Sequence, residues 1–425
     1  MELEFKPHKI LCKSCKKEPS VITLSTTKTF LCAPCFNNFF EKKVKETIEK
    51  YRMFDLKDRV GVFLSGGKDS TTLMAVLKKL YPDLHLQGIY LNLGIRYHSE
   101  MVEGVVKELC QKLEVPLYVY NLPEREGYFI DDFIFTSFKD KICSACGTIK
   151  RNLFSKIAKE LGLTVIATGH HLDDTVSTMF TLFIQGDFSS LIKLSPVLPP
   201  LYSGQAKKVK PLYKTPEKEI LYYAKLNQLP FETSPCPHGE LTPIKKYKKV
   251  IEELEKVNPQ IKYQLLSVFN RRLIPLLKPS EEEVLETCLT CGEITSSSSK
   301  ICARCKRISL LEKVSEKTLE VTAEEFLKQT KELEDHNWVL LDLREKEDFE
   351  RHPIKGACWI PSSLISEGEK KFYKFLKPYK KKILFFTCYS EKLSYLFTLR
   401  ARKMGFKAYN LKDFENLVKL KIKGD

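Results

Sequence analysis

An apolar segment that ends in a glycine-rich turn limits what this chain can fold into. RVGVFL at residues 59–64 has the character of a buried strand, SGGKDS follows at once, and a helical apolar pattern then runs to Leu80. Gly66 and Gly67 let the backbone approach a phosphate, the first amides of the helix point at it, and Lys68 adds positive charge. The segment predicts a phosphate-binding loop that matches neither GxxxxGK[ST] nor GxGxxG.

The strand–helix alternation continues beyond this loop. Further strands are expected at residues 85–91, 116–120 and 164–168, with helices near 101–113 and 148–161. This pattern predicts an α/β fold with a doubly wound parallel sheet, whose ligand lies at the carboxyl ends of the strands.

The last of these strands runs into GHHLDD at residues 169–174. Asp173 and Asp174 are expected at the same sheet edge as Lys68, where they can bind magnesium on a pyrophosphate or transfer protons. The alternative is that both carboxylates only favour a helix start through the dipole, and that His170 and His171 are polar packing.

Eight of the 14 cysteines form two sets of paired Cys-x2-Cys knuckles. Two knuckles complete a tetrahedron of thiolates, which replaces a core that so short a segment cannot build. The spacing predicts two structural zinc ions, in an N-terminal and a second zinc ribbon, with RNA contact as a further role. The ligands are Cys12, Cys15, Cys32 and Cys35 in the first ribbon and Cys288, Cys291, Cys302 and Cys305 in the second.

The other six cysteines are less regular. Cys110 falls on the apolar face of a helix-like stretch and Cys358 lies in the strand-like GACWIP, so both are predicted to be core residues. Cys143 and Cys146 form a lone knuckle whose one plausible partner is Cys236, between two prolines. From spacing alone, a metal or iron–sulfur cluster, thiol chemistry and a bystander role all stay open for these three.

The charge composition indicates which class of molecule the protein binds. Seventy Lys and Arg against 54 Asp and Glu give a net charge of +16, which favours a polyanion. The 425 residues suggest two to four domains, each with a core. No run of 18 apolar residues and no signal-peptide pattern occur, so we expect a cytoplasmic protein that does not bind a membrane.

Several motifs together resemble a known family. SGGKDS, CSACGTIKR, VIATGHHLDD and the flanking ribbons, over about residues 8–306, resemble the tRNA 2-thiouridine synthetases that thiolate uridine 54. The resemblance implies a pyrophosphate-loop ATPase that adenylates O2 of a tRNA uridine and then displaces AMP with sulfur. This order is chemically reasonable, because adenylation converts a poor electrophile into one with a good leaving group.

The resemblance also implies roles for individual residues. The expected catalytic residues are Lys68, Asp69, Lys150 and Asp174. The expected ATP-binding residues are Phe63, Leu64, Ser65, Gly66, Gly67, Lys68, Asp69, Ser70, Leu91, Lys150 and Gly169. Cys143, Cys146 and Cys236 would ligate three irons of a 4Fe–4S cluster whose fourth iron carries the sulfide. ATP is the expected substrate, with Mg as cofactor.

Two features of this region are specific to the chain. Some relatives have His where the first ribbon has Cys35, a change that leaves zinc binding intact. The segment after Cys236 is rich in lysine, which predicts either a phosphate-backbone surface or a solvated helix. Its lysines include Lys245, Lys246, Lys248 and Lys249.

The last hundred residues resemble a single rhodanese domain. Cys388 follows an apolar strand at residues 383–386 and precedes a helix from about Leu393, a position that lowers a thiol pKa and stabilises a persulfide. Active rhodanese loops usually have Gly and Arg where this chain has Glu391 and Leu393. Efficient thiosulfate turnover is therefore in doubt; persulfide relay through Cys388 is expected, and a degenerate docking domain is the alternative.

These assignments divide the chain into five parts. They are a zinc ribbon at 1–40, the pyrophosphate-loop domain at 41–280, a second ribbon at 281–310, a linker at 311–322 that lets the last part swing, and the rhodanese-like domain at 323–425. The expected partners are tRNA and a sulfur donor, either a persulfide carrier or a ubiquitin-like thiocarboxylate protein. A homodimer through the ribbons is also expected.

Other functions compete with this interpretation. The same chemistry on uridine 34 or cytidine 32 is the nearest alternative, although the cytidine enzymes lack terminal ribbons. An ATP-dependent amide ligase shares the loop but does not need Cys143, Cys146 and Cys236. A non-enzymatic RNA-binding and sulfur-trafficking protein would require a degenerate loop, and Lys68, Asp69 and Ser70 are all present.

Overall fold

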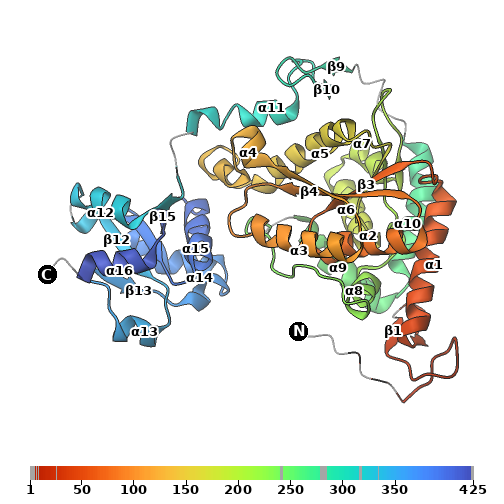
Figure 1. Ribbon diagram of the computed structural model, residues 1–425, viewed down its shortest axis with the longest axis horizontal. Helices are drawn as coiled ribbons and strands as arrows, with labels where there is room; N and C mark the ends of the chain where they lie inside the picture. The colour runs from red at the N-terminus through yellow and green to blue at the C-terminus, as the bar shows by residue number, and fades with distance from the viewer. Residues whose placement is uncertain are drawn as a thin grey trace. The chain divides into compact units, whose positions relative to one another are not determined.

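The computed structural model describes residues 5, 7, 9–24, 26–239, 243–277, 285–314, 318–333 and 335–422. These residues form two compact units (Figure 1). The first unit contains Met1–Leu93, His98–Gly127 and Gly147–Arg304, and the second contains Gly94–Tyr97, Tyr128–Cys146 and Cys305–Asp425.

The first unit is built on a six-stranded sheet with the strand order β5-β4-β3-β6-β8-β7. All neighbouring strands are parallel except β7, which runs antiparallel to β8 at the edge. The strands are β3 (Arg59–Leu64), β4 (His85–Asn92), β5 (Leu117–Asn121), β6 (Val165–Ala167), β7 (Val197–Leu198) and β8 (Lys207–Val209). The predicted parallel sheet is confirmed, and the two outer strands β7 and β8 add to it.

Strand β3 lies at the centre of this sheet. Its residues after Arg59 are all buried, which explains why RVGVFL reads as a continuous apolar run rather than an alternating one. The chain moves outward from β3 to β4 and β5 and then returns to β6 on the other side of β3. The carboxyl ends of β3 and β6 therefore form the topological switch point, where ligands bind in such sheets.

Helices cover both faces of the sheet, as a doubly wound fold requires. One core contains the apolar sides of α1 (Ala33–Tyr51), α2 (Lys68–Leu80), α3 (Ser99–Lys112) and α8 (Glu217–Leu226). On the opposite face, Phe63 of β3 packs on Phe154 of α5 (Ile142–Glu160), with ring centroids 3.7 Å apart. Short helices α4 (Leu122–Glu126) and α7 (Phe188–Leu191) lie in connections.

A further cluster joins α6 to the helices that follow the sheet. Buried Val176 and Met179 of α6 (Leu172–Gln185) pack with Ile251 of α9 and Leu266 of α10. These helices are α9 (Pro243–Val257) and α10 (Ile261–Val268), and a single π turn, Phe269–Leu273, continues α10. The side chains of residues 243–246 lie outside the described part, so the predicted roles of Lys245 and Lys246 fall outside it as well.

Each ribbon is a small antiparallel hairpin with little core of its own. The first contains β1 (Ile22–Leu24) and β2 (Thr29–Leu31), and the second contains β9 (Glu286–Thr287) and β10 (Ile294–Thr295). Helix α11 (Ala303–Ile308) carries the last cysteine of the second ribbon. Strands of two or three residues cannot bury enough apolar surface to be stable alone, which is consistent with a metal-held fold.

The second unit contains a five-stranded parallel sheet with the order β11-β15-β14-β12-β13. Its strands are β11 (Glu320–Val321), β12 (Trp338–Asp342), β13 (Ala357–Trp359), β14 (Ile383–Thr387) and β15 (Lys407–Leu411). Its helices are α12 (Ala323–Lys331), α13 (Lys346–Arg351), α14 (Glu369–Leu376), α15 (Glu391–Lys403) and α16 (Phe414–Ile422). Helices α14 and α15 pack on one face of the sheet, and α12 and α16 pack on the other.

Three details of this unit differ from expectation. Glu320 and Val321, assigned to the linker, form strand β11 and pair with β15. Helix α15 begins at Glu391, two residues earlier than expected. Cys358 is exposed and not a core residue, because it points outward from the edge strand β13, whereas Cys110 is buried as predicted. Among the described residues, no helix is long and apolar enough to span a membrane.

Candidate functional site

The phosphate loop between β3 and α2 is closed by its own serine. The Ser65 backbone N–H donates to Oγ of Ser70 at 3.1 Å, and the Ser70 hydroxyl lies 3.1 Å from the carbonyl oxygen of Gly67. Gly66 has φ of +72°, and a Cβ there would lie 2.4 Å from a methyl group of Val102. Glycine is therefore required at this turn, which aims the first amides of α2 into the space above β3.

A second glycine brings the end of β6 against the same helix start. A Cβ on Gly169 would lie 3.0 Å from the backbone carbon of Asp69 and 3.0 Å from the Ser70 nitrogen. The absent side chain lets the GHHLDD segment touch the phosphate loop. The two motifs that the sequence placed on separate strands therefore meet at the switch point.

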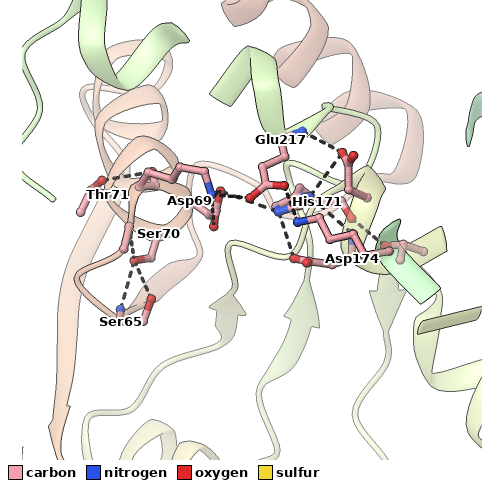
Figure 2. Close-up of polar contacts among 12 residues, drawn as sticks. Ser65, Asp69, Ser70, Thr71, His171, Asp174 and Glu217 are labelled. Atoms are coloured by element: carbon pink, nitrogen blue, oxygen red, sulfur yellow. Dashed lines mark hydrogen bonds and ion pairs between the residues drawn. The ribbon is translucent and has the colours of Figure 1, made fainter. Parts of the chain in front are cut away.

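Lys68 is held by carboxylates at the first turn of α2. Its Nζ lies 2.7 Å from Oε1 of Glu217 and 3.1 Å from Oδ1 of Asp69 (Figure 2). Burial lowers the pKa of Lys68, but Asp69 and Glu217 outweigh this effect, so its pKa lies above its ordinary value. Lys68 is therefore a fixed positive charge beside the loop, as the sequence predicts.

Glu217, the first residue of α8, joins the loop to α9. Its second oxygen accepts from Lys248, so one carboxylate bridges two ammonium groups. Burial opposes ionisation, yet hydrogen bonds from Lys248 and Lys68 lower the pKa of Glu217 to about 2. Lys248, for which the sequence left a phosphate-backbone surface and a solvated helix open, is half-buried and paired with Glu217, whereas Lys249 is exposed.

His171 lies among three carboxylates at the start of α6. Its Nε2 is 3.2 Å from Asp174 and 3.7 Å from Asp69, and its Nδ1 is 3.7 Å from Asp173. Burial raises the pKa of Asp69, although His171 and Lys68 act in the opposite direction. Figure 2 shows Asp69, His171, Asp174 and Glu217 converging between the two loops.

The third carboxylate has a structural role. Asp173 is buried; its Oδ2 accepts the Glu217 backbone N–H at 2.8 Å, and its Oδ1 lies 2.6 Å from Nζ of Lys262 on α10. Asp174 is partly exposed and, among the described residues, lies 3.2 Å from His171, so it is the more accessible of the two carboxylates. The acidic pair thus divides into one buried anchor and one accessible group.

Three more of the predicted ATP residues lie at this edge. Phe63, Leu64 and Leu91 are buried at the carboxyl ends of β3 and β4, with exposures of 7, 4 and 8%. Lys150 is half-buried on α5, one turn after Cys146. The structure therefore assembles the apolar wall, the loop and the acidic groups at one sheet edge.

The three cysteines predicted to bind a cluster lie in two kinds of local structure. Cys143 and Cys146 are three residues apart at the start of α5 and thus on one helix face, and both are half-buried. Cys236 is also half-buried, in a turn closed by a 2.8 Å bond from the Gly239 N–H to the Cys236 carbonyl. Each thiol is accessible enough to accept a metal.

The eight ribbon cysteines form the two predicted groups. Within each group the four sulfur atoms lie within 4.8 Å of one another, so each can bind one metal ion. Burial opposes ionisation of Cys12 and Cys288, but backbone N–H groups lower the pKa of each to about 6. A thiolate is thus favoured at Cys12 and Cys288, whereas burial raises the pKa of Cys32 and Cys35.

Cys388 lies in the loop between β14 and α15 of the second unit. Its thiol is buried, and this burial raises its pKa even though N–H groups of Ser390 and Tyr389 act to lower it. The expected lowering by the helix start is therefore outweighed. Arg344 is paired with Asp342 at 2.7–3.1 Å and donates to the Tyr389 hydroxyl of this loop at 3.5 Å.

Comparison with known proteins now identifies the family. The PP-loop domain family matches residues 36–238, and the rhodanese-like domain family matches residues 323–414. The tRNA-5-methyluridine(54) 2-sulfurtransferase of Pyrococcus horikoshii is 33% identical over 317 residues, which cover 74% of this chain and 99% of that protein. The chain belongs to the tRNA 2-thiolation sulfurtransferases.

Other members of this tRNA 2-thiolation family extend the comparison. The Thermotoga maritima protein of the same name is 30% identical over 72% of this chain and 99% of its own length. Cytoplasmic tRNA 2-thiolation protein 1 of Aspergillus niger is 31% identical over 72% of this chain and 90% of its own. The family membership confirms the expected ATP-binding PP-loop fold and an ATP-dependent thiolation enzyme.

A solved structure has the same fold over much of this chain. The U34-tRNA thiolase NcsA from Methanococcus maripaludis, solved with its 4Fe–4S cluster, superposes with a TM-score of 0.61. It is 24% identical and covers 70% of this chain and 95% of its own.

The structure adds site residues that sequence reasoning missed. Glu217 and Lys262 contact the predicted residues Lys68 and Asp173 from helices far along the chain. Pro216 followed by an acidic residue is a helix-start signal that predicts α8, but nothing local indicates that Glu217 reaches the loop. His171, left open as packing, lies at the centre of the acidic group.

We expect Glu217→Gln to lower the melting temperature by about 2–4 °C at neutral pH and to lose that difference in acid. The pKa of Glu217 falls from 4.5 to about 2 on folding, so its charge stabilises the folded state above 4.5 and ceases to do so towards 2. Melting of both proteins between pH 7 and pH 3 measures this, with exposed Glu49→Gln as control. A difference that does not change with pH would contradict the assignment.

Proposed function

We propose that this chain is a tRNA uridine 2-sulfurtransferase that uses ATP to thiolate uridine 54 in the T loop. The observation that carries the proposal is the near-complete coverage, 99%, of relatives named for position 54 in Pyrococcus horikoshii and Thermotoga maritima. The loop and acidic groups at the β3–β6 edge are the parts that adenylation requires. Uridine 34 is the alternative target, because other relatives and NcsA are named for related tRNA thiolation.

The first half-reaction joins AMP to O2 of the uridine. The loop amides and Lys68 neutralise the phosphate charges of ATP, and O2 attacks the α-phosphorus as pyrophosphate leaves. Phe63, Leu64 and Leu91 form an apolar wall for the nucleotide, and Lys150 is assigned to the nucleotide as well. The uridine then carries AMP as its leaving group.

We assign magnesium to the acidic group. Oδ1 of Asp69 is buried and lies 3.1 Å from Nζ of Lys68, and the partly exposed Asp174 approaches the same imidazole of His171 as Asp69 does. Two carboxylates that converge in this way beside the phosphate loop suit a hard cation that also binds phosphate. Asp69 and Asp174 would hold the ion.

We assign an iron–sulfur cluster to Cys143, Cys146 and Cys236, and zinc to the two groups of four cysteines. Three thiolates leave one iron of a 4Fe–4S cluster without a protein ligand, and half-exposed cysteines suit a site that must admit a reactant. Such a cluster supplies a Lewis-acidic iron that favours a deprotonated sulfur ligand. Pairing of two copies through the zinc ribbons is a further part of the proposal.

Cys388 is assigned as a persulfide carrier. Its thiolate attacks the outer sulfur of a persulfide donor, a new S–S bond forms, and the donor leaves as a thiol. Release of that sulfur as sulfide takes two electrons, which a thiol reductant supplies as it becomes a disulfide. The raised pKa of Cys388 predicts that this exchange accelerates above neutral pH.

Mass spectrometry of tRNA nucleosides tests the function. The reconstituted full chain is incubated without oxygen with ATP, magnesium, sulfide and unmodified tRNA, and any thiolated base is mapped by fragment analysis. We expect 2-thiouridine in the T loop. A thiolated anticodon would move the target to position 34, and RNA without sulfur would overturn the proposal in favour of an amide ligase.

Replacing Cys388 by serine tests the relay. We expect about a hundredfold lower thiolation with a persulfide donor at low concentration, because the carrier acts at high effective concentration, and unchanged thiolation with free sulfide. The exposed Cys358→Ser protein is the matched control. Equal loss with both sulfur sources would contradict a relay.

A further inference from the structure

Part of the second unit comes from a distant region of the sequence. Residues Gly94–Tyr97 and Tyr128–Cys146 group with the rhodanese-like residues Cys305–Asp425. The main contact joins α15 to a 3₁₀ turn at Ile130–Phe135. The same segment continues through Cys143 and Cys146, two of the predicted cluster ligands.

A buried carboxylate lies at the centre of this contact. Asp131 is completely buried and accepts the hydroxyl of Tyr395, which is only 1% exposed. Asp131 also accepts the Arg96 backbone N–H at 3.0 Å, and the Arg96 guanidinium lies 3.8 Å away. Burial and the Asp131 charge raise the pKa of Tyr395 well above its usual value, so the phenol remains a hydrogen-bond donor.

Charged groups extend the contact on either side. Nε of Arg96 lies 3.0 Å from Glu320 of β11, and the Tyr97 hydroxyl lies 3.1 Å from the same glutamate. At the other edge, the Arg402 guanidinium stacks over the ring of Phe135 at 5.2 Å. A buried Asp131 without these partners would lose more free energy than the hydrogen bonds contribute when they are formed. We therefore expect the contact either to form with all its partners or not to form.

The contact accounts for a residue that departs from the rhodanese pattern. Glu391, where active rhodanese loops usually have glycine, accepts from the Tyr97 hydroxyl at 3.0 Å through Oε2. Its Oε1 accepts the Asp413 N–H at 3.2 Å. Both oxygens of Glu391 are therefore occupied by docking and loop contacts.

We propose that residues 94–97 and 130–135 form a docking surface for the rhodanese-like domain of the same chain. The surface binds α15 and β11 through Asp131–Tyr395, Arg96–Glu320 and Tyr97–Glu391. It holds the domain that carries Cys388 on the segment that leads into Cys143 and Cys146. Its role in sulfur delivery rests on the proposed function; the docking itself does not.

Tyr395→Phe in the full-length protein tests the docking. The change keeps the ring but leaves Asp131 without its main donor, so we expect amide exchange in residues 128–135 and in α15 to accelerate by about tenfold or more. Tyr373→Phe on α14, with an exposed ring, is the matched control and should change neither. Unchanged exchange in Tyr395→Phe and in Asp131→Asn would overturn the docking surface.

The same variants test its role in sulfur delivery. We expect Tyr395→Phe to lower thiolation with a persulfide donor by about tenfold and to leave thiolation with free sulfide unchanged, because proximity matters only to the relay. If Tyr395→Phe accelerates amide exchange but its thiolation rate, relative to the wild type, is the same with the persulfide donor as with free sulfide, the role in delivery is overturned. Absence of thiolation by the wild type with sulfide would instead count against the proposed function, and the exchange result would stand.

Discussion

Replacing Lys68 by alanine is expected to lower AMP and pyrophosphate formation by about 10²–10³-fold, as loss of a group that stabilises transition-state charge does elsewhere. Lys68 is the ammonium group at the first turn of α2, and its pairing with Glu217 and Asp69 holds it beside the phosphate loop. In its absence those carboxylates also repel the phosphates. Pyrophosphate release in the presence of tRNA measures the effect.

The control for this experiment is Lys78→Ala, at the other end of the same helix. It removes an equal charge and side chain about two and a half turns from the loop. We expect adenylation to be unchanged there. If both variants lose activity equally, the effect is one of net charge or folding, and the assignment of Lys68 to the phosphates is wrong.

Replacing Cys143 by serine is expected to lower thiolation by at least about a hundredfold. Mutation of a group that only orients a metal ligand already lowers metal affinity or activity by about 10–100-fold. Serine keeps the size of the side chain at the start of α5 but is a poor ligand for iron. ATP binding should be retained, because the phosphate loop lies between β3 and α2, whereas Cys143 lies on α5. Nucleoside mass spectrometry and nucleotide binding measure the two effects.

The exposed Cys358→Ser variant removes an equivalent thiol from an edge strand of the other sheet. It should retain both activities and the visible absorbance of an iron–sulfur protein. Full thiolation by Cys143→Ser would refute the cluster assignment. Loss of nucleotide binding together with thiolation would show that the cysteine supports the fold of α5 instead.

The site was predictable where a local pattern carries the chemistry. The glycines of SGGKDS and the acidic end of VIATGHHLDD each follow an apolar strand, and parallel strands end at one edge. Lys68 and Asp174 could therefore be placed together before their distances were known. Four cysteines in two knuckles likewise predict a ribbon, because tetrahedral ligation leaves few other arrangements.

The sequence by itself determined the elements and the residues that carry the chemistry, because hydrophobic period, turn residues and ligand spacing are local properties. Only the tertiary structure decided which charged and polar residues contact one another. Glu217 reaches Lys68 from 149 positions away, and Tyr395 reaches Asp131 from 264. Such pairs leave no local pattern in the sequence, because an acidic residue at a helix start looks the same whether or not it contacts a distant lysine. Burial also reversed the expected shift of Cys388, because desolvation depends on packing around the thiol and not on its position before a helix.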